Sequence, residues 1–215
     1  MTHLKRQKTP RKWPVTKKGT KYVVRTPEMN KGLPALIILR DMLKVVQNRK
    51  ELKKSINAKH VLVNWKPIID VRKSVLLLDV ITLVPSKKNY RLGLSKTGKF
   101  EIVEIPEKES VIKISKIVNK KILKGKKTQL NLSDGRNILS EIKCDVDDSV
   151  LIDLKNRKIE KCIPLREGTK AIIFEGKHSG KSGVIKKIAK EKKIAELDVD
   201  GKKTNVLIKQ FMAVE

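Results

Sequence analysis

The residues with the clearest potential for chemistry form a glycine-rich basic loop at 175–183. Its Gly180-Lys181-Ser182 matches the end of a phosphate-binding loop, in which backbone N–H groups and a lysine hold the phosphates of a nucleotide. That loop needs four residues between its glycines, and here three separate them. Gly183 also stands where the following helix should strengthen, although residues 184–189 could be helical. The spacing therefore argues against nucleotide binding, and we expect no small-molecule substrate.

Two other groups of residues could hold a metal. Cys144 and Cys162 lack both the CxxC spacing and the clustered histidines of a zinc site, so two buried, reduced thiols in a cytosolic protein are the better interpretation. Asp145, Asp147 and Asp148 could attract a cation, but no EF-hand loop surrounds them. Nowhere does the sequence combine a nucleophile, a base and an acid. We expect no metal, no cofactor and no enzymatic activity.

Charge gives the strongest indication of a partner. The 215 residues include 51 Lys and Arg against 23 Asp and Glu, a formal net charge of +28. Self-repulsion on this scale favours an anionic partner, either nucleic acid or a membrane surface. The longest apolar run, Leu76–Leu78, is far shorter than the roughly 20 residues of a membrane-spanning helix, and the basic N-terminus lacks a signal peptide's apolar core. We expect a soluble, intracellular protein that binds a polyanion and no membrane.

The first 30 residues form a basic N-terminal segment. Residues 1–25 contain nine cations and no acid, which predicts an extended arm. We expect residues 2–18 to become ordered only against RNA, because few of their side chains are apolar. Trp13 leaves two alternatives open: it either anchors the arm on its own domain or stacks on RNA.

A pair of helices is predicted next. Apolar residues recur at helical spacing from Leu36 to Val46, after a proline that suits a first helical turn. Asn48 is a good N-cap for a second helix, whose inward face contains Leu52 and Ile56. The opposite face stacks cations on consecutive turns, an arrangement best explained by phosphates lying against it: Arg49, Lys50, Lys53 and Lys54.

The rest of the chain has the period-two pattern of strands. Strands are predicted at 60–64 and 78–83, and turn signals then alternate with short strands in an acid-containing middle. We therefore predict a multi-domain α+β protein in four parts. These are a basic arm at 1–30, a helix-and-strand domain at 31–85, a central β-rich domain at 86–167 and a C-terminal domain at 168–215.

Three patterns resemble parts of one family. Residues 34–84 resemble the S4 RNA-binding module, in Val61-Leu62-Val63-Asn64 and in Asp79-Val80-Ile81, but Trp65 replaces its turn glycine and Leu76–Leu78 its glycine-containing approach. The loop resembles the KOW motif of RNA-associated proteins, with structural glycines that allow positive φ at a tight bend: Gly176, Gly180 and Gly183. The opening, His3-Leu4-Lys5-Arg6 followed by Pro10 and Trp13, resembles that of the S4e family of small-subunit ribosomal proteins.

The order of these parts is also that of the S4e family. The resemblance implies a KOW-type SH3-like β-barrel, a structural role in the small ribosomal subunit, and cytoplasmic, ribosome-bound localisation beside neighbouring small-subunit proteins. The chain stops soon after the KOW element without a basic tail, which favours an archaeal member. The expected contacts with ribosomal RNA are Lys5, Arg6, Lys8, Arg11, Lys12, Trp13, Lys17, Lys18, Arg40, Lys44, Arg49, Lys50, Lys53, Lys54, Lys59, Lys66, Lys177, His178 and Lys181.

Two other functions compete with this one. An RNA-modifying enzyme could carry an S4-like module, but residues 86–215 contain no acid–base set for a catalytic domain. A KOW-containing transcription or translation factor would bind RNA transiently, and a strongly basic arm argues against rapid release. Retention on the small subunit during a salt wash separates the two binding functions.

Overall fold

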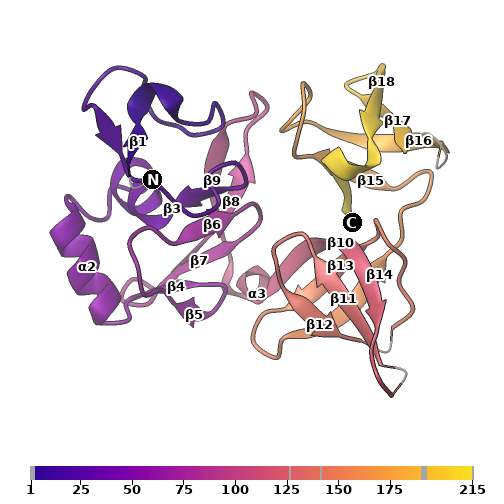
Figure 1. Ribbon diagram of the computed structural model, residues 1–215, viewed down its shortest axis with the longest axis horizontal. Helices are drawn as coiled ribbons and strands as arrows, with labels where there is room; N and C mark the ends of the chain where they lie inside the picture. The colour runs from indigo at the N-terminus through magenta and orange to yellow at the C-terminus, as the bar shows by residue number, and fades with distance from the viewer. Residues whose placement is uncertain (1–2, 126, 141, 190–192, 215) are drawn as a thin grey trace. The chain divides into compact units, whose positions relative to one another are not determined.

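The computed structural model describes residues 3–125, 127–140, 142–189 and 193–214. It forms two compact units (Figure 1): unit 1 comprises Met1–Ser95 and Lys99–Val111, and unit 2 comprises Lys96–Gly98 and Ile112–Glu215. Strands dominate both units, and the described helices are few and short. None of these helices has the length and apolar character needed to cross a membrane.

Unit 1 is built on a five-stranded antiparallel sheet. Its order is β5 (Lys66–Pro67), β4 (Val61–Val63), β7 (Val80–Leu83), β8 (Lys88–Leu94) and β9 (Phe100–Ile105). Two smaller pairs are β1 (Leu4–Lys5) with β2 (Tyr22–Val23), and β3 (Gly32–Pro34) with β6 (Ser74–Leu76). Its helical segments are η1 (Arg6–Lys8), α1 (Ala35–Ile37), η2 (Ile38–Met42), α2 (Arg49–Asn57) and α3 (Glu107–Ser110). The predicted boundary at residue 86 therefore falls inside one sheet, between β7 and β8.

The predicted helix pair is present, but its first member is shorter than expected. The helical segment that begins at Ala35 ends at Met42, and Lys44 has a left-handed φ of 53°. The second helix begins as predicted, because the Asn48 side chain accepts a hydrogen bond from the Glu51 N–H at 2.9 Å. Leu52 is fully buried and Ile56 is nearly so, which turns the other side of α2 outward.

A two-residue turn between β4 and β5 carries the main departure from the S4 pattern. Asn64 and Trp65 have φ values of 51° and 61°, as a type I′ hairpin turn requires, and Val63 pairs with Lys66 across it. Glycine or asparagine usually takes such positions, so a tryptophan needs support. Its indole N–H donates to the Ser110 carbonyl at 3.0 Å. The expected turn forms, and a tertiary hydrogen bond holds the residue that replaces glycine.

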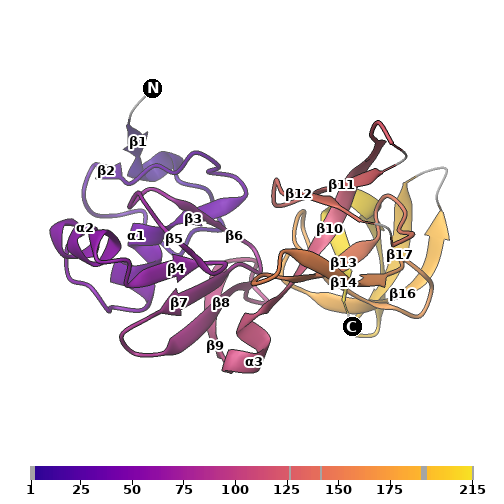
Figure 2. The same cartoon turned by 90° about the horizontal axis from the view of Figure 1, so that it is seen from below.

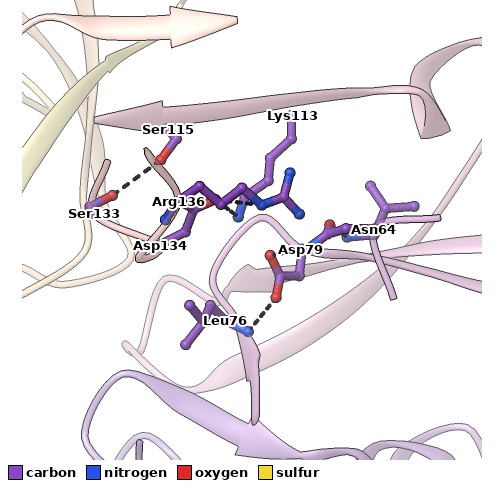
Figure 3. A network of polar contacts seen from close by, with 9 residues as sticks. Asn64, Leu76, Asp79, Lys113, Ser115, Ser133, Asp134 and Arg136 are labelled. Atoms are coloured by element: carbon purple, nitrogen blue, oxygen red, sulfur yellow. Dashed lines mark hydrogen bonds and ion pairs between the residues drawn. The ribbon is translucent and has the colours of Figure 1, made fainter. Parts of the chain in front are cut away.

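The two polar residues of the S4-like pattern form one buried network (Figure 3). Asn64 donates to an Asp79 carboxylate oxygen at 2.8 Å and accepts from the Val80 N–H at 3.1 Å. The other Asp79 oxygen accepts from the Leu76 N–H at 2.8 Å. A buried polar group is costly unless it is hydrogen-bonded, and this network satisfies both side chains while it joins β4 to β7.

The N-terminal segment differs from the predicted arm. Leu4 and Trp13 are 5% and 2% exposed and belong to the same apolar core as Leu36 and Leu52. The Trp13 indole N–H donates to the Met29 carbonyl at 3.3 Å. The prediction of disorder without RNA is therefore wrong across residues 3–18, while residue 2 lies outside the described residues. The apolar partners of Leu4 and Trp13 come from distant parts of the sequence, so local composition could not reveal them.

Unit 2 contains two antiparallel sheets of five strands. The central sheet has the order β12 (Asn137–Leu139), β11 (Thr128–Leu132), β10 (Ile112–Ile122), β13 (Ser149–Asp153) and β14 (Lys158–Ile163). The C-terminal sheet has the order β18 (Lys202–Leu207), β17 (Ile194–Val199), β16 (Ser182–Ala189), β15 (Lys170–Ile173) and β19 (Phe211–Val214), with η3 (Ile208–Gln210) before β19. Each sheet has its own apolar core. The two sheets are joined at Lys116, whose ammonium donates to the carbonyls of Ile208 and Phe211.

The glycine-rich loop connects β15 to β16, and residues 184–189 continue as a strand rather than a helix. Gly176 and Gly180 both have a φ of 89°, as the predicted bend requires. The prediction that Gly183 adopts a positive φ is wrong, because its φ is not positive. A side chain there would place Cβ 2.4 Å from the Asp198 carbonyl oxygen, so the close approach of β17 is what demands glycine.

Candidate RNA interface

The outer face of α2 is the most uniform cationic surface among the expected contacts. Arg49, Lys50, Lys53 and Lys54 are all exposed, and the apolar side of the helix faces the core. Figure 2 shows α2 at the margin of unit 1, with the rest of the unit on one side of it. The only acid of the helix, Glu51, accepts from the Gln47 N–H at 2.7 Å and so stays at the helix N-terminus. The cations therefore stack at i,i+4 with little compensation.

Cations at the two ends of the helix pair have different surroundings. Lys44 and Lys59 are exposed, with left-handed φ values of 53° and 57°, and Lys66 is exposed on β5. Arg40 is half-buried and lies 2.7 Å from the Asp41 carboxylate. That hydrogen bond raises the pKa of Arg40 above its ordinary value. Arg40 thus remains charged with its charge partly compensated, which makes it a weaker phosphate contact than the exposed lysines.

Two of the N-terminal cations stabilise their own loop. The Arg6 guanidinium donates to the carbonyls of Thr16 and Thr20, at 3.0 and 2.7 Å, and to the Thr20 hydroxyl at 2.7 Å. Lys17 donates to the carbonyl and hydroxyl oxygens of Thr9 at 2.9 and 3.1 Å. These bonds hold residues 6–20 in a compact loop. Of the remaining cations of the segment, Lys12 and Arg25 are half-buried and five are exposed: Lys5, Lys8, Arg11, Lys18 and Lys21.

Trp13 has to be removed from the predicted RNA contacts. Only 2% of the residue is exposed, so its ring has no free face on which a base could stack. Of the two alternatives that the sequence left open, the structure supports the anchor. Leu4 and Val15 pack in the same core, but their apolar character alone did not distinguish between the two alternatives.

The glycine loop offers fewer free cations than its sequence suggests. Lys177 is exposed, His178 is half-buried, and Lys181 lies 3.7 Å from the Asp200 carboxylate. The Ser179 hydroxyl donates to the Phe174 carbonyl at 3.1 Å, which closes the loop on itself. Since β16 follows the loop, no helix N-terminus faces it to bind a phosphate, as a nucleotide-binding loop would require.

The acidic cluster and the two thiols have structural roles. Asp148 accepts hydrogen bonds from the N–H groups of Asp145 and Leu165, at 2.9 and 2.8 Å. Among the described residues no group of His, Cys, Asp and Glu side chains could hold a metal ion. Cys144 and Cys162 are free thiols, the first buried and the second half-buried. Burial, with the neighbouring Cys144 and Asp148, raises the pKa of Cys162 to about 12, so its thiol stays protonated.

Comparison with known proteins places this geometry in a family. A family profile described as "Ribosomal family S4e" matches residues 86–159. The small ribosomal subunit protein eS4 of Methanocella arvoryzae is 38% identical over 190 residues, which cover 86% of this chain and 80% of that protein. The eS4 proteins of Methanothermobacter thermautotrophicus and Nanoarchaeum equitans are 37% and 35% identical and cover 86% and 87% of this chain, and 78% and 82% of their own lengths.

A solved structure has the same fold. The crystal structure of the 30S ribosomal protein S4e from Thermoplasma acidophilum matches this chain with a TM-score of 0.73 at 24% identity, covering 86% of this chain and 95% of the other. These matches, with the β-rich fold and its basic helix, define the class as a ribosomal protein. The chain belongs to the ribosomal family S4e. The expectations of S4e membership, of a protein that is not an enzyme, and of archaeal kinship are confirmed by these relatives.

Proposed function

We propose that this chain is a structural constituent of the small ribosomal subunit, where it binds ribosomal RNA through the outer face of α2. The observation that supports this most directly is the stack of four exposed cations, Arg49, Lys50, Lys53 and Lys54. Relatives named as small ribosomal subunit proteins support the assignment to that subunit. The expected partners are ribosomal RNA and neighbouring small-subunit proteins on cytoplasmic ribosomes.

The energetics of α2 favour an anionic partner. Arg49/Lys53 and Lys50/Lys54 are like-charged i,i+4 pairs, and each destabilises an isolated helix by about 0.2–0.5 kcal/mol. Phosphates against this face remove the repulsion and release condensed counterions, so binding is favourable mainly through entropy. Lysine is a point charge that contacts phosphate without reading bases. We therefore expect affinity for structured RNA with little preference for sequence.

Other exposed cations extend this surface in the proposal. Lys44, Lys59 and Lys66 flank α2, and five further cations of the N-terminal segment remain exposed: Lys5, Lys8, Arg11, Lys18 and Lys21. Within unit 1 we assign the helix pair and β4–β7 to an S4-like module, because Asn64 and Asp79 form one network across those strands. In unit 2 we assign the C-terminal sheet and its glycine loop to a KOW-type domain, with Lys177 as the exposed lysine of that loop.

The experiment compares two triple variants of the full chain. Lys50→Gln, Lys53→Gln and Lys54→Gln together remove three charges from α2, whereas the control replaces with glutamine three exposed lysines of unit 2 that lie outside the glycine loop: Lys187, Lys202 and Lys209. We expect the α2 variant to lose at least about tenfold in affinity for small-subunit ribosomal RNA. The salt slope, which is the magnitude of the slope of log K against log[salt], should fall by about 2, since each phosphate contact contributes about 0.7–0.9. An α2 variant that binds like the control contradicts the proposal.

A sedimentation measurement separates a structural protein from a transient factor. We expect the parental chain to remain with the small subunit through a wash in which salt is raised, because many phosphate contacts dissociate together only slowly. Release at salt concentrations that leave known subunit proteins in place would instead support the transient transcription or translation factor.

A further inference from the structure

The end of the β10–β11 hairpin is a surface that the proposed function leaves unused. Residues Ile112–Lys116 of β10 pair with β13, and Ile117 exchanges backbone hydrogen bonds with Asp147 and Asp148, whereas residues 119–122 pair with β11 alone. The register shifts between Ile117 and Asn119, and a bulge of this kind bends a strand away from its sheet. Figures 1 and 2 show the end of the hairpin extending beyond the other strands of the central sheet. It is therefore open on the side where β13 no longer pairs.

The end of the hairpin is also strongly cationic. Lys121, Lys124 and Lys127 are exposed, and the sequence contains no acidic residue between Glu109 and Asp134. Lys120 differs from them, because its ammonium donates to the Cys144 carbonyl at 2.9 Å and fixes the hairpin to the central sheet. The positive charge is thus concentrated on a supported element, whereas β13 and β14 of the same sheet contain the acids Asp153 and Glu160.

An exposed apolar residue follows Lys121 in β10. Ile122 is 74% exposed, and it points to the face opposite Lys121, because side chains alternate along a strand. The Leu123 N–H donates to the Lys127 carbonyl at 2.8 Å, which closes the hairpin with a short loop. Nucleic acid lying around the end of the hairpin complements both faces, with phosphates for the lysines and sugar or base faces for Ile122.

We propose that the end of the β10–β11 hairpin, residues 118–125 and 127, is a second RNA-binding element that contacts the sugar–phosphate backbone of structured RNA. This inference rests on the proposed function, since it requires the chain to bind RNA. It adds a contact in unit 2, within the acid-containing middle of the sequence. An acidic protein segment is the competing occupant, and RNA is favoured because the proposed function already brings RNA to this chain.

The test uses the full chain and small-subunit ribosomal RNA from Methanothermobacter thermautotrophicus. Lys121→Gln, Lys124→Gln and Lys127→Gln together should weaken binding at least about tenfold and lower the salt slope by about 2, with unchanged circular dichroism and thermal midpoint. Ile122→Ala should weaken binding about threefold without changing the slope, because it removes contact area and no charge. The variant of Lys187, Lys202 and Lys209 is the control of equal charge.

The outcomes separate this inference from the proposed function. A parental chain whose RNA affinity is insensitive to salt contradicts the proposed function itself. A hairpin variant that binds RNA within about twofold of the parent, while the α2 variant is weak, overturns only the hairpin proposal. Normal RNA binding combined with loss of incorporation into the small subunit would assign the hairpin to an acidic protein neighbour, and it too overturns the proposal.

Discussion

Two sets of lysines show how differently one side chain acts in this fold. On α2, Lys50, Lys53 and Lys54 are exposed and have few compensating charges. On β10, the side chains of Lys113 and Lys116 are only 1% and 4% exposed. Both sets belong to a chain of high net positive charge, and both are closely spaced in sequence. The comparison shows that charge content does not separate lysines that bind a partner from lysines that hold the fold together.

The ammonium groups of both buried lysines contact oxygen atoms of other residues. The Lys113 ammonium lies 2.7 Å from an Asp134 carboxylate oxygen, and Arg136 approaches the same oxygen at 3.5 Å (Figure 3). Lys116 contacts Asp147 at 3.0 Å in addition to the two carbonyls that join the sheets of unit 2. Burial lowers the pKa of Lys116, and the hydrogen bond and charge of Asp147 only partly oppose that shift.

The largest expected effect is the loss of a buried partner. Lys113→Met leaves the Asp134 carboxylate with Arg136 alone, and removing one member of a buried ion pair costs about 3–5 kcal/mol. We expect the urea midpoint of the transition that unfolds unit 2 to fall accordingly. Lys53→Met on α2 should change the free energy of unfolding by no more than about 0.5 kcal/mol. Similar losses of stability in the two variants would show that burial does not distinguish the two sets of lysines.

A smaller effect is expected on lowering the pH. Burial alone would raise the pKa of Asp134, but the charge and hydrogen bond of Lys113, with the N–H and charge of Arg136, lower it below the ordinary value of 3.8. The ion pair therefore stabilises unit 2 above pH 3.8, and this contribution is lost as the pH falls through the folded-state pKa.

The measurement is urea unfolding of the parent and of Asp134→Asn between neutral pH and about pH 2.5. The parent should be more stable near neutral pH, and the difference between the two proteins should shrink as Asp134 becomes protonated. A difference that stays constant over this range would show that the Asp134 charge does not contribute to the stability of unit 2.

The smallest expected effect is a gain in stability on α2. Lys50→Gln with Lys54→Gln removes one like-charged i,i+4 pair while it keeps helix propensity, so the free protein should gain about 0.2–0.5 kcal/mol. The same change should weaken RNA binding. Thermal unfolding at low salt, where repulsion is strongest, is the sensitive measurement. A loss of stability would mean that these lysines, like Lys113, support the fold.

Local sequence signals predicted the elements that depend on neighbouring residues. Asn48 caps α2, Leu52 and Ile56 turn inward, and strands form at the predicted alternating segments. These features require only backbone periodicity and a capping side chain close in sequence. The segment at 184–189 was ambiguous for the same reason, since its short apolar pattern fits a helix or a strand, and pairing of β16 with β15 and β17 settles it as a strand.

Predictions failed where distant residues decide the outcome. The sequence left Trp13 as either a core anchor or an RNA contact, and its burial in the core of unit 1 decides for the anchor. Gly183 must be small because the Asp198 carbonyl approaches from another strand. The burial of Lys113 follows from Asp134, which lies 21 residues further along the chain. None of these neighbours can be identified from local spacing.

By itself the sequence determined that the protein carries a large positive charge and resembles the S4e family, and that α2 presents a cationic face. Composition, capping and periodicity are local properties, so they can be predicted without knowledge of the fold. Only the tertiary structure decided which cations remain available. Arg6 and Lys17 bind loop oxygens, Lys113 and Lys116 are buried among oxygen atoms, and the lysines at the end of the β10–β11 hairpin stay exposed. Burial and long-range pairing depend on segments far apart in the chain, and folding alone brings them together.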